Sequence, residues 1–273
     1  MKRTIIGILA AALLLCGAQA LLLADGNILV VGEMTREAKA GPGDKAEGKL
    51  ILRNQGDKPQ DVKIYQTDYH FTAAGNNTYG EPGKLPRSNA GWFAFNPQQL
   101  TVPAQGTATV YYTAQVPKDD KLKGTYWSML MVEPLAADSP EAGGTDQHKV
   151  KVGVRTVTRY GIQFVTNIGD GAKADIKFVD RQLIARDKHI LLQADVENIG
   201  ERWLSPIVWV ELYDKDGATV GRFSSTRQRV FPGCSARFTI DLSDVPKGKY
   251  NALTVADNGD DNVFGTQAEV EIK

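Results

Sequence analysis

Residues 148–168 read His-Lys-Val-Lys-Val-Gly-Val-Arg-Thr-Val-Thr-Arg-Tyr-Gly-Ile-Gln-Phe-Val-Thr-Asn-Ile. Apolar, aromatic or hydroxyl-bearing side chains occupy the even-numbered positions 150–164, and cations or glycines occupy most odd-numbered positions. An alternation of period two indicates a β-strand with one apolar face and one cationic face. Because strands usually have only about 5–6 residues, a strand of this length either crosses a whole sandwich or runs from one domain into the next. We expect it to close one β-sandwich and to lead into a second.

The rest of the chain of 273 residues has the pattern of short strands separated by turns. Turn-forming residues recur at intervals of about 8–12 residues, which is typical of sandwiches, and no stretch keeps a helical period. Residues 72–91 are rich in Gly, Asn and Pro and predict a long loop. The sequence therefore predicts an all-β fold of two tandem immunoglobulin-like β-sandwich domains, covering residues 21–168 and 169–273.

A weak internal repeat supports two copies of one topology. Asn54-Gln55-Gly56 follows an apolar stretch in the first half, and Asn198-Ile199-Gly200 follows one in the second. A Val-Pro pair stands before a strand that begins with glycine at 116–124, and again at 245–248. A repeat of this kind favours two similar sandwiches over one large sheet.

The N-terminus carries an export signal in residues 1–20. Lys2 and Arg3 precede an apolar stretch at 5–15, and residues 18–20 read Ala-Gln-Ala, a small-x-small cleavage site. Residues 21–23 continue the apolar run, so an uncleaved membrane anchor is the alternative. No later stretch reaches the ~18 apolar residues of a membrane span. We expect a periplasmic protein, or one associated with the cell surface, with no membrane span after cleavage.

Charge and cysteine content narrow the function classes further. The chain has 32 basic and 32 acidic residues, so its net charge gives no electrostatic case for nucleic-acid binding. Its two cysteines are Cys16, inside the signal peptide, and Cys234. No disulfide can form within the mature chain. Because Cys234 follows the turn Phe231-Pro232-Gly233, we expect it to be structurally minor.

No catalytic or metal-binding motif is visible. His70, His148 and His189 stand alone in the sequence, and Cys234 has no sequence cue for activation. A hydrolase is therefore disfavoured, and we expect neither a metal nor a cofactor. The stretch Asp-Asn-Gly-Asp-Asp-Asn at 257–262 could hold calcium through its oxygens, but it lacks the spacing of a calcium loop. An acidic turn between two strands is favoured.

One family shows a similar order of motifs. Val116-Pro117-Lys118-Asp119 is followed by an aromatic-Ser apolar strand at 126–134, a variable loop, and the long strand with its Val-Arg-Thr-Val-Thr-Arg-Tyr element at 154–160. This order resembles the first domain of the periplasmic pilus-assembly chaperones, the PapD-like family. The resemblance covers residues 28–168, and extends to 169–273 only in architecture. Thr166-Asn167-Ile168 replaces the family's Arg-Pro, and Gly124-Thr125 replaces its Glu-Ser.

The resemblance implies a non-enzymatic protein that binds secreted or pilus-type subunits by β-strand donation. Main-chain hydrogen bonds and alternate apolar side chains would complete an open client sandwich, and a cation would hold the client's terminal carboxylate. The implied client-strand residues are Val150, Val152, Val154, Ile162 and Phe164, and the implied carboxylate anchors are Arg36 and Arg159. The alternative is a structural or adhesive envelope protein whose long strand serves only its own fold.

Overall fold

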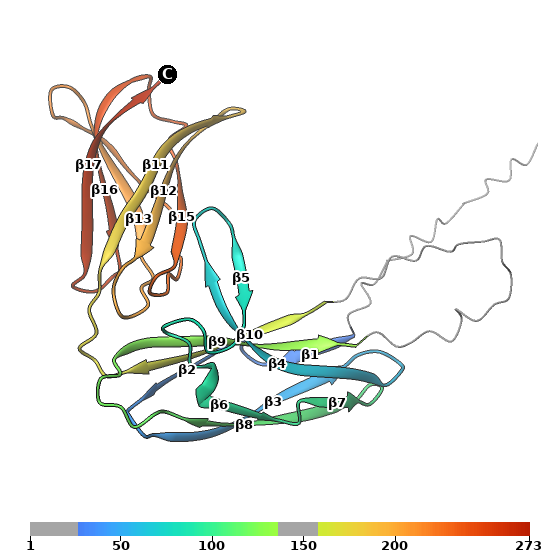
Figure 1. The fold of residues 1–273 in the computed structure, drawn as a ribbon. Coiled ribbons are helices and arrows are strands. Elements are labelled where there is room, and N and C mark those ends of the chain that lie inside the picture. Colours follow the sequence, from blue (N-terminus) through green and yellow to red (C-terminus); the bar gives the residue numbers. More distant parts are fainter. Residues whose placement is uncertain (1–26, 136–157) are drawn as a thin grey trace, which may run out of the picture.

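The computed structural model describes residues 27–135 and 158–273, which form two β-sandwiches arranged as the two arms of a bent molecule (Figure 1). The described part contains seventeen strands and one short 3-10 helix. The all-β prediction and the two immunoglobulin-like sandwiches are confirmed. The proposed signal peptide and residues 136–157, with Val150, Val152 and Val154, lie outside the described residues.

The first sandwich consists of a four-stranded sheet, in the order β1-β3-β8-β6, and a second sheet in the order β2-β10-β9-β4-β5, with β7 also paired to β4. Its strands are β1 (Ile28–Val31), β2 (Thr35–Ala40), β3 (Lys45–Asn54), β4 (Gln60–Phe71), β5 (Asn77–Gly80), β6 (Phe93–Asn96), β7 (Gln99–Val102), β8 (Thr107–Gln115), β9 (Gly124–Pro134) and β10 (Tyr160–Ile168). The helix η1 (Ala90–Trp92) directly precedes β6.

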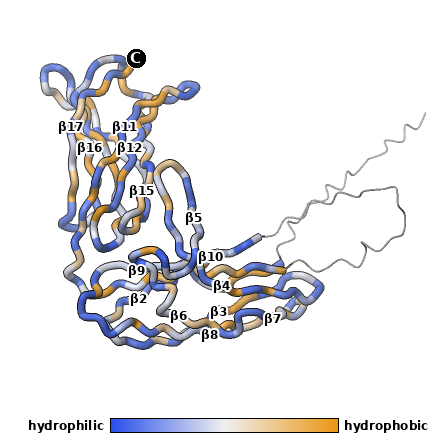
Figure 2. The backbone as a smooth tube through the Cα atoms, in the orientation of Figure 1, coloured by the Kyte–Doolittle hydropathy of each residue, from blue (hydrophilic) through white to orange (hydrophobic). Residues whose placement is uncertain are grey.

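The second sandwich pairs a three-stranded sheet, β11-β12-β15, with a four-stranded sheet, β14-β13-β16-β17. Its strands are β11 (Ile176–Arg186), β12 (His189–Asn198), β13 (Ile207–Tyr213), β14 (Thr219–Ser224), β15 (Ser235–Asp241), β16 (Gly248–Asp257) and β17 (Val263–Ile272). No described strand belongs to sheets of both sandwiches. Figure 2 shows hydrophobic residues along the strands and hydrophilic residues concentrated in the loops.

The two sandwiches repeat one topology, as the sequence repeat predicts. The strand that ends at the repeated asparagine is β3 in the first sandwich, where it pairs with β8, and β12 in the second, where it pairs with β15. The strand that begins at the repeated glycine, β9 or β16, lies in the middle of the other sheet. This is the strand order of immunoglobulin-like sandwiches. The first sandwich has additional strands, among them β6 at the end of one sheet and β2, which follows β1, changes sheets and pairs parallel with β10. No equivalent of β2 covers β17 in the second sandwich.

Asn54 and Asn198 perform the same task in their sandwiches. Each is fully buried, and each side-chain amide donates to the carbonyl four residues ahead and to a second carbonyl from a distant segment. Each side-chain oxygen accepts from the glycine two residues later, at 2.8 Å in the first copy and 2.9 Å in the second. A buried amide with its bonds satisfied fixes the turn after the strand, which explains the Asn-x-Gly repeat.

Three sequence expectations are corrected by the structure. The strand expected over residues 148–168 is not continuous, because Thr158 and Arg159 lie outside any strand and β10 begins at Tyr160. The loop at 72–91 contains β5, which pairs with the end of β4. Cys234 does follow a turn, but its side chain is fully buried in the core cluster of the second sandwich.

Candidate functional site

The candidate site is the edge of the first sandwich where β10 begins. All nine residues of β10 pair antiparallel with β9, but β2 covers the other side of β10 only from Gln163 onward. The backbone of residues 160–162 therefore has no strand on that side among the described residues. An unpaired edge of this kind offers main-chain donors and acceptors to another strand. The exposed Val31 and Met34, 44% and 39% exposed, lie where β1 crosses to β2 beside this edge.

The inward face of β10 is occupied by the protein's own core. Ile162 is fully buried and Phe164 is 2% exposed. The ring of Phe164 meets those of Phe93, Phe95 and Tyr112 edge-on, with centroids 4.9, 5.3 and 5.1 Å away. Side chains packed in this way are not free to enter a client. The structure therefore does not support Ile162 and Phe164 as client contacts, while Val150, Val152 and Val154 lie outside the described residues.

Arg159 lies on the outer surface just before β10, in a small polar cluster. Its guanidinium is 3.7 Å from the carboxylate of Glu133 and donates to the hydroxyl of Tyr65 at 3.4 Å. The Tyr65 hydroxyl donates in turn to Glu133 at 2.8 Å, and burial together with this carboxylate raises the pKa of Tyr65. The Arg159 side chain remains 55% exposed. Its charge is partly compensated but still accessible.

Arg36 lies on the opposite face of the same sheet. It stands opposite Phe164 in the parallel pairing of β2 with β10, so both side chains leave the sheet toward the interior of the sandwich. The Nε atom of Arg36 is buried without a hydrogen-bond partner, and the guanidinium lies against Gly32, whose φ of +100° requires glycine. Because the sheet separates Arg36 from Arg159, the structure does not bring the two predicted anchors together.

The residue next to Arg36 joins the two sandwiches. The Glu37 carboxylate accepts hydrogen bonds from the Nε1 of Trp203 at 2.7 Å, from the amide of Asn167 at 2.8 Å, and from the guanidinium of Arg229 at 3.0 Å. The Arg229 guanidinium also lies 4.0 Å from the centre of the Trp203 ring. We call this set the Glu37 contact. It fixes the edge strand β2 to the second sandwich.

An apolar interface reinforces the Glu37 contact. Trp127 of β9 and Val165 of β10 belong to the same buried cluster as the core of the second sandwich. The hairpin of β4 and β5 reaches beside the second sandwich (Figure 1), where a ring nitrogen of His70 lies 2.9 Å from the carbonyl of Gly233. Sequence reasoning missed these contacts, since Glu37 and its partners Trp203 and Arg229 lie 166 and 192 residues apart.

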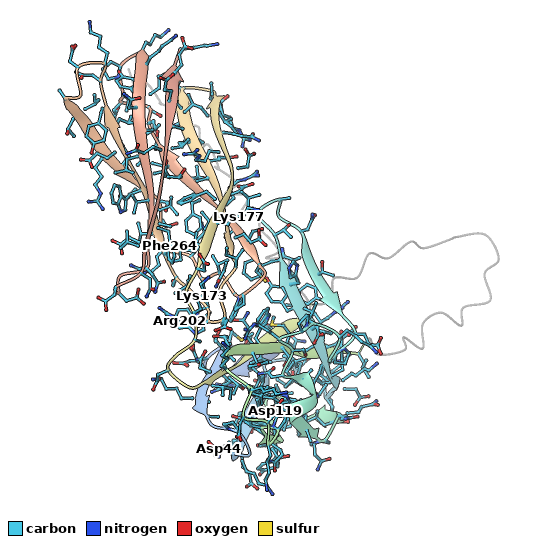
Figure 3. The ribbon with its side chains drawn as sticks, turned by 60° about the vertical axis from the view of Figure 1, so that its left-hand side comes forward. Asp44, Asp119, Lys173, Lys177, Arg202 and Phe264 are labelled. Carbon is cyan, nitrogen blue, oxygen red and sulfur yellow. The ribbon has the colours of Figure 1, made fainter. Side chains whose placement is uncertain are left out.

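Between the sandwiches lies a polar cavity of about 580 Å³. Figure 3 shows Lys173 and Arg202 at this junction. Lys39 lies 3.4 Å from Asp170, and Lys173 lies 2.6 Å from Asp175. These cations already have carboxylate partners, and such solvent-exposed ion pairs contribute little to the stability of the junction.

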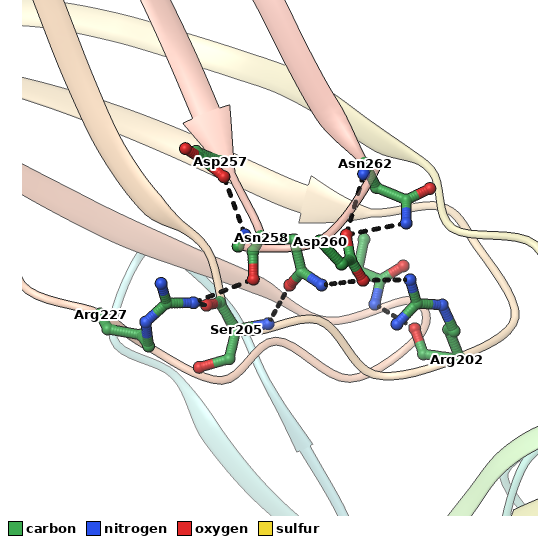
Figure 4. A network of polar contacts seen from close by, with 9 residues as sticks. Arg202, Ser205, Arg227, Asp257, Asn258, Asp260 and Asn262 are labelled. Atoms are coloured by element: carbon green, nitrogen blue, oxygen red, sulfur yellow. Dashed lines mark hydrogen bonds and ion pairs between the residues drawn. The ribbon is translucent and has the colours of Figure 1, made fainter.

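The acidic turn at 257–262 is closed by internal hydrogen bonds (Figure 4). Asp260 accepts from the guanidinium of Arg202 at 2.8 Å, from the side chains of Asn258 and Asn262, and from the backbone N–H of Asn262. Partial burial opposes ionisation of Asp260, but the bonds from Arg202, Asn262 and Asn258 outweigh it and hold the pKa far below its usual range. Donors, one of them cationic, therefore occupy the oxygens that calcium would need. Within residues 27–135 and 158–273, no group of three or more His, Cys, Asp or Glu side chains could hold a metal ion.

No model of a known protein family matches this sequence, and no curated protein matches it. Several solved structures are similar in fold. A chain from a chaperone–tip adhesin complex of CFA/I fimbriae biogenesis has a TM-score of 0.48 and 12% identity, covering 90% of this chain and 100% of that one.

Two chaperone structures are similar to a comparable degree. The class 5 fimbriae chaperone CfaA gives a TM-score of 0.45 at 10% identity, covering 90% of this chain and 100% of its own. The E. coli chaperone DraB gives 0.40 at 14%, with 90% and 96% covered. At such identities the similarity concerns the course of the backbone alone. In the part of the chain that the structure describes, no helix is long and apolar enough to cross a membrane.

Proposed function

We propose that this chain is a non-enzymatic, chaperone-like protein of the periplasm, which binds secreted or pilus-type subunits by β-strand pairing at the edge of its first sandwich. The observation that carries the proposal is the half-open β10, whose residues 160–162 pair with β9 but not with β2. The chain just before this edge contains the alternating Val150, Val152 and Val154. We place the division between the client-binding domain and the second domain at residues 168 and 169.

The physical basis is strand addition. A subunit that lacks a strand exposes unpaired backbone groups and an unfilled core, both of which promote aggregation. A donated strand satisfies the backbone groups through main-chain hydrogen bonds, and its alternate apolar side chains fill the gap. The valines supply such side chains, whereas Ile162 and Phe164 anchor the strand in this protein's own core.

Of the two arginines, Arg159 fits the role of an anchor for a client carboxylate at this edge. It lies at the end of β10 that is open to a client, on the outer surface, and is more than half exposed. A client carboxylate would have to compete with Glu133 for the guanidinium. Arg36 points between the sheets, so its role is considered separately below.

The test combines two substitutions with a pull-down of the mature protein from a periplasmic extract, analysed by mass spectrometry. We expect Val152→Arg to abolish the capture of specific subunits and to leave the thermal midpoint nearly unchanged. Arg159→Ala should weaken capture and cost less than about 1 kcal/mol of stability, since its own ion pair is exposed. Tyr111→Arg is the matched control, because Tyr111 is 61% exposed on β8 in the other sheet.

Two results would contradict the proposal. A folded Val152→Arg protein that still captures the same subunits would show that strand donation is not the mechanism. A Val152→Arg protein that unfolds, while Tyr111→Arg does not, would show that the strand serves this protein's own fold. The latter result would favour a structural or adhesive envelope protein with tandem immunoglobulin-like domains.

A further inference from the structure

Between its two sheets the first sandwich has a cavity of about 360 Å³ that is open to solvent beside the edge strand β2. Small-molecule sites in proteins have volumes of about 300–1,000 Å³. Asp44, at its rim, lies at the end of this sandwich away from the second one (Figure 3). The cavity borders the polar cavity between the sandwiches, since Glu37 and Lys39 line both, but Arg36 lines only the cavity in the first sandwich.

The cavity exists because inward-facing positions carry alanine. Ala38 and Ala40 follow Arg36 on the inward face of β2, and Ala46 of β3 lies directly opposite Ala114 of β8. Elsewhere in this sandwich the inward positions of β3 and β8 carry Leu50, Leu52 and Val110, all fully buried. Four short side chains from three strands thus leave the sandwich open at this place, where Ala38 and Ala46 are exposed to solvent and Ala40 and Ala114 are partly exposed.

Aromatic and charged side chains line this space, the charged ones being Arg36, Lys39, Lys45, Glu33, Glu37 and Asp44. Trp92, Phe93, Tyr112 and Phe164 form apolar walls, and the rings of Phe93 and Tyr112 pack against that of Phe164. Arg36 lines the same cavity, with its Nε buried and without a partner. A buried N–H of a charged group is costly when no acceptor pairs with it.

The acids near the rim do not neutralise Arg36. The Asp44 carboxylate accepts from the backbone N–H of Gly41 at 2.7 Å, and Glu37 is engaged by the second sandwich. Glu33 also lines the cavity and forms no ion pair with Arg36. Within the described residues no carboxylate lies within ion-pair distance of Arg36, although nine other ion pairs are present. The guanidinium is thus available to a carboxylate, which it can bind through two parallel hydrogen bonds.

We propose that this cavity binds a medium-chain alkyl carboxylate, with the carboxylate at Arg36 and the alkyl chain along Ala38, Ala40, Ala46 and Ala114. The three inward positions of β2, from residue 36 to residue 40, span about 13 Å, the length of an extended chain of that class. The site differs from the proposed client edge, because neither Arg159 nor residues 160–162 line it.

Isothermal titration of the mature full-length protein with straight-chain carboxylates of increasing length, below their micelle-forming concentrations, tests the proposal. Each added methylene should lower Kd about fourfold until the cavity is full, after which Kd should level off. An n-alcohol of equal length should bind at least tenfold more weakly. Absence of both the chain-length trend and the carboxylate preference would overturn the proposal.

Two variants locate the site. Arg36→Met should raise the Kd of the carboxylate to that of the alcohol, whereas Arg53→Met, an exposed arginine of β3 away from the cavity, should have no effect. Ala114→Leu should shorten the longest chain that binds tightly, whereas Ala94→Leu, on an exposed position of β6, should not. If Arg36→Met fails to fold, Arg36→Lys keeps the charge without the two-bond geometry and should give an intermediate Kd.

A second readout depends on Trp92, one of the four tryptophans. A bromine-labelled alkyl carboxylate should quench part of the fluorescence, and Trp92→Phe should remove that part. Quenching that persists in Trp92→Phe would place the ligand elsewhere and refute the assignment. Binding of peptides with an apolar C-terminal residue, without binding of alkyl carboxylates, would also refute it. The two experiments can be told apart: absence of alkyl carboxylate binding would not change the result of the subunit pull-down, and absence of subunit capture would not change the result of the titration.

Discussion

The ring of Trp127 stacks on that of Phe231, with centroids 4.8 Å apart and planes inclined by 23°, so that one sandwich completes the core of the other. Trp127 comes from β9 of the first sandwich and is 4% exposed, while its indole N–H donates to the carbonyl of Tyr69 at 2.7 Å. Phe231 comes from the turn before β15 and is 2% exposed. The orientation of the two arms therefore depends on buried aromatic surface.

Phe231→Ala should uncouple the two sandwiches. Removal of a buried phenylalanine costs about 3–5 kcal/mol, and here the loss falls on the interface. We expect one calorimetric transition in the wild type and two separated transitions in the variant, with a red shift of Trp127 emission. Phe238→Ala is the control, because Phe238 is fully buried inside the second sandwich. A single transition in Phe231→Ala, at the midpoint of the wild type, would disprove the coupling.

Glu37→Ala should loosen the angle between the sandwiches. The substitution removes the shared acceptor of Trp203, Asn167 and Arg229, and leaving such donors unpaired costs about 1–3 kcal/mol. Spin labels placed on the two sandwiches should show a broader distance distribution. Glu33→Ala removes a carboxylate from the same segment that makes no hydrogen bond with described residues, so it should leave the distribution narrow. Equal distributions in all three proteins would contradict the proposed role of Glu37.

Cys234 should resist thiol reagents in the folded protein. Burial raises the pKa of its thiol to about 11, so at pH 8 it stays protonated and inaccessible. Because the unfolded thiol ionises near pH 9, its contribution to stability is complete below that pH and is lost as the pH rises toward 11. Cys234→Ser should cost about 1–3 kcal/mol, since it places a hydroxyl in an apolar site. If Cys234 reacted with a thiol reagent as fast in the native protein as in the unfolded protein, its side chain would not be buried.

Asp260 should make the free energy of unfolding decrease as the pH falls below about 4. Its pKa in the folded protein lies far below the usual range, whereas in the unfolded chain it lies near 3.9. The contribution of Asp260 is therefore complete above about pH 4 and declines as the pH falls below that value. Urea midpoints between pH 2 and 6 should fall less steeply in Asp260→Asn than in the wild type. Asp261→Asn is the control, and identical slopes in all three proteins would refute the prediction.

The sequence by itself predicted the architecture, because local patterns carry it. Alternating polarity and regularly spaced turns predicted an all-β chain, and the repeated Asn-x-Gly predicted two copies of one sandwich. That repeat can be recognised in the sequence because the asparagine side chain accepts a hydrogen bond from a glycine only two residues ahead. The strand β2 was missed, since its sequence Thr-Arg-Glu-Ala-Lys-Ala has no apolar alternation. Its inward positions carry the alanines and the arginine of the cavity.

The tertiary structure alone decided which side chains are committed to the core and which are free. The alternation at 148–168 could not separate a client-binding face from a core face, and packing against Phe93, Phe95 and Tyr112 assigned Phe164 to the core. Arg36 and Arg159 are both cations near one strand, but the sheet places them on opposite faces. The junction between the sandwiches depends on partners more than 100 residues apart, such as Trp127 and Phe231. Periodicity and spacing report a residue's immediate neighbours, whereas burial and charge pairing depend on segments that meet only when the chain folds.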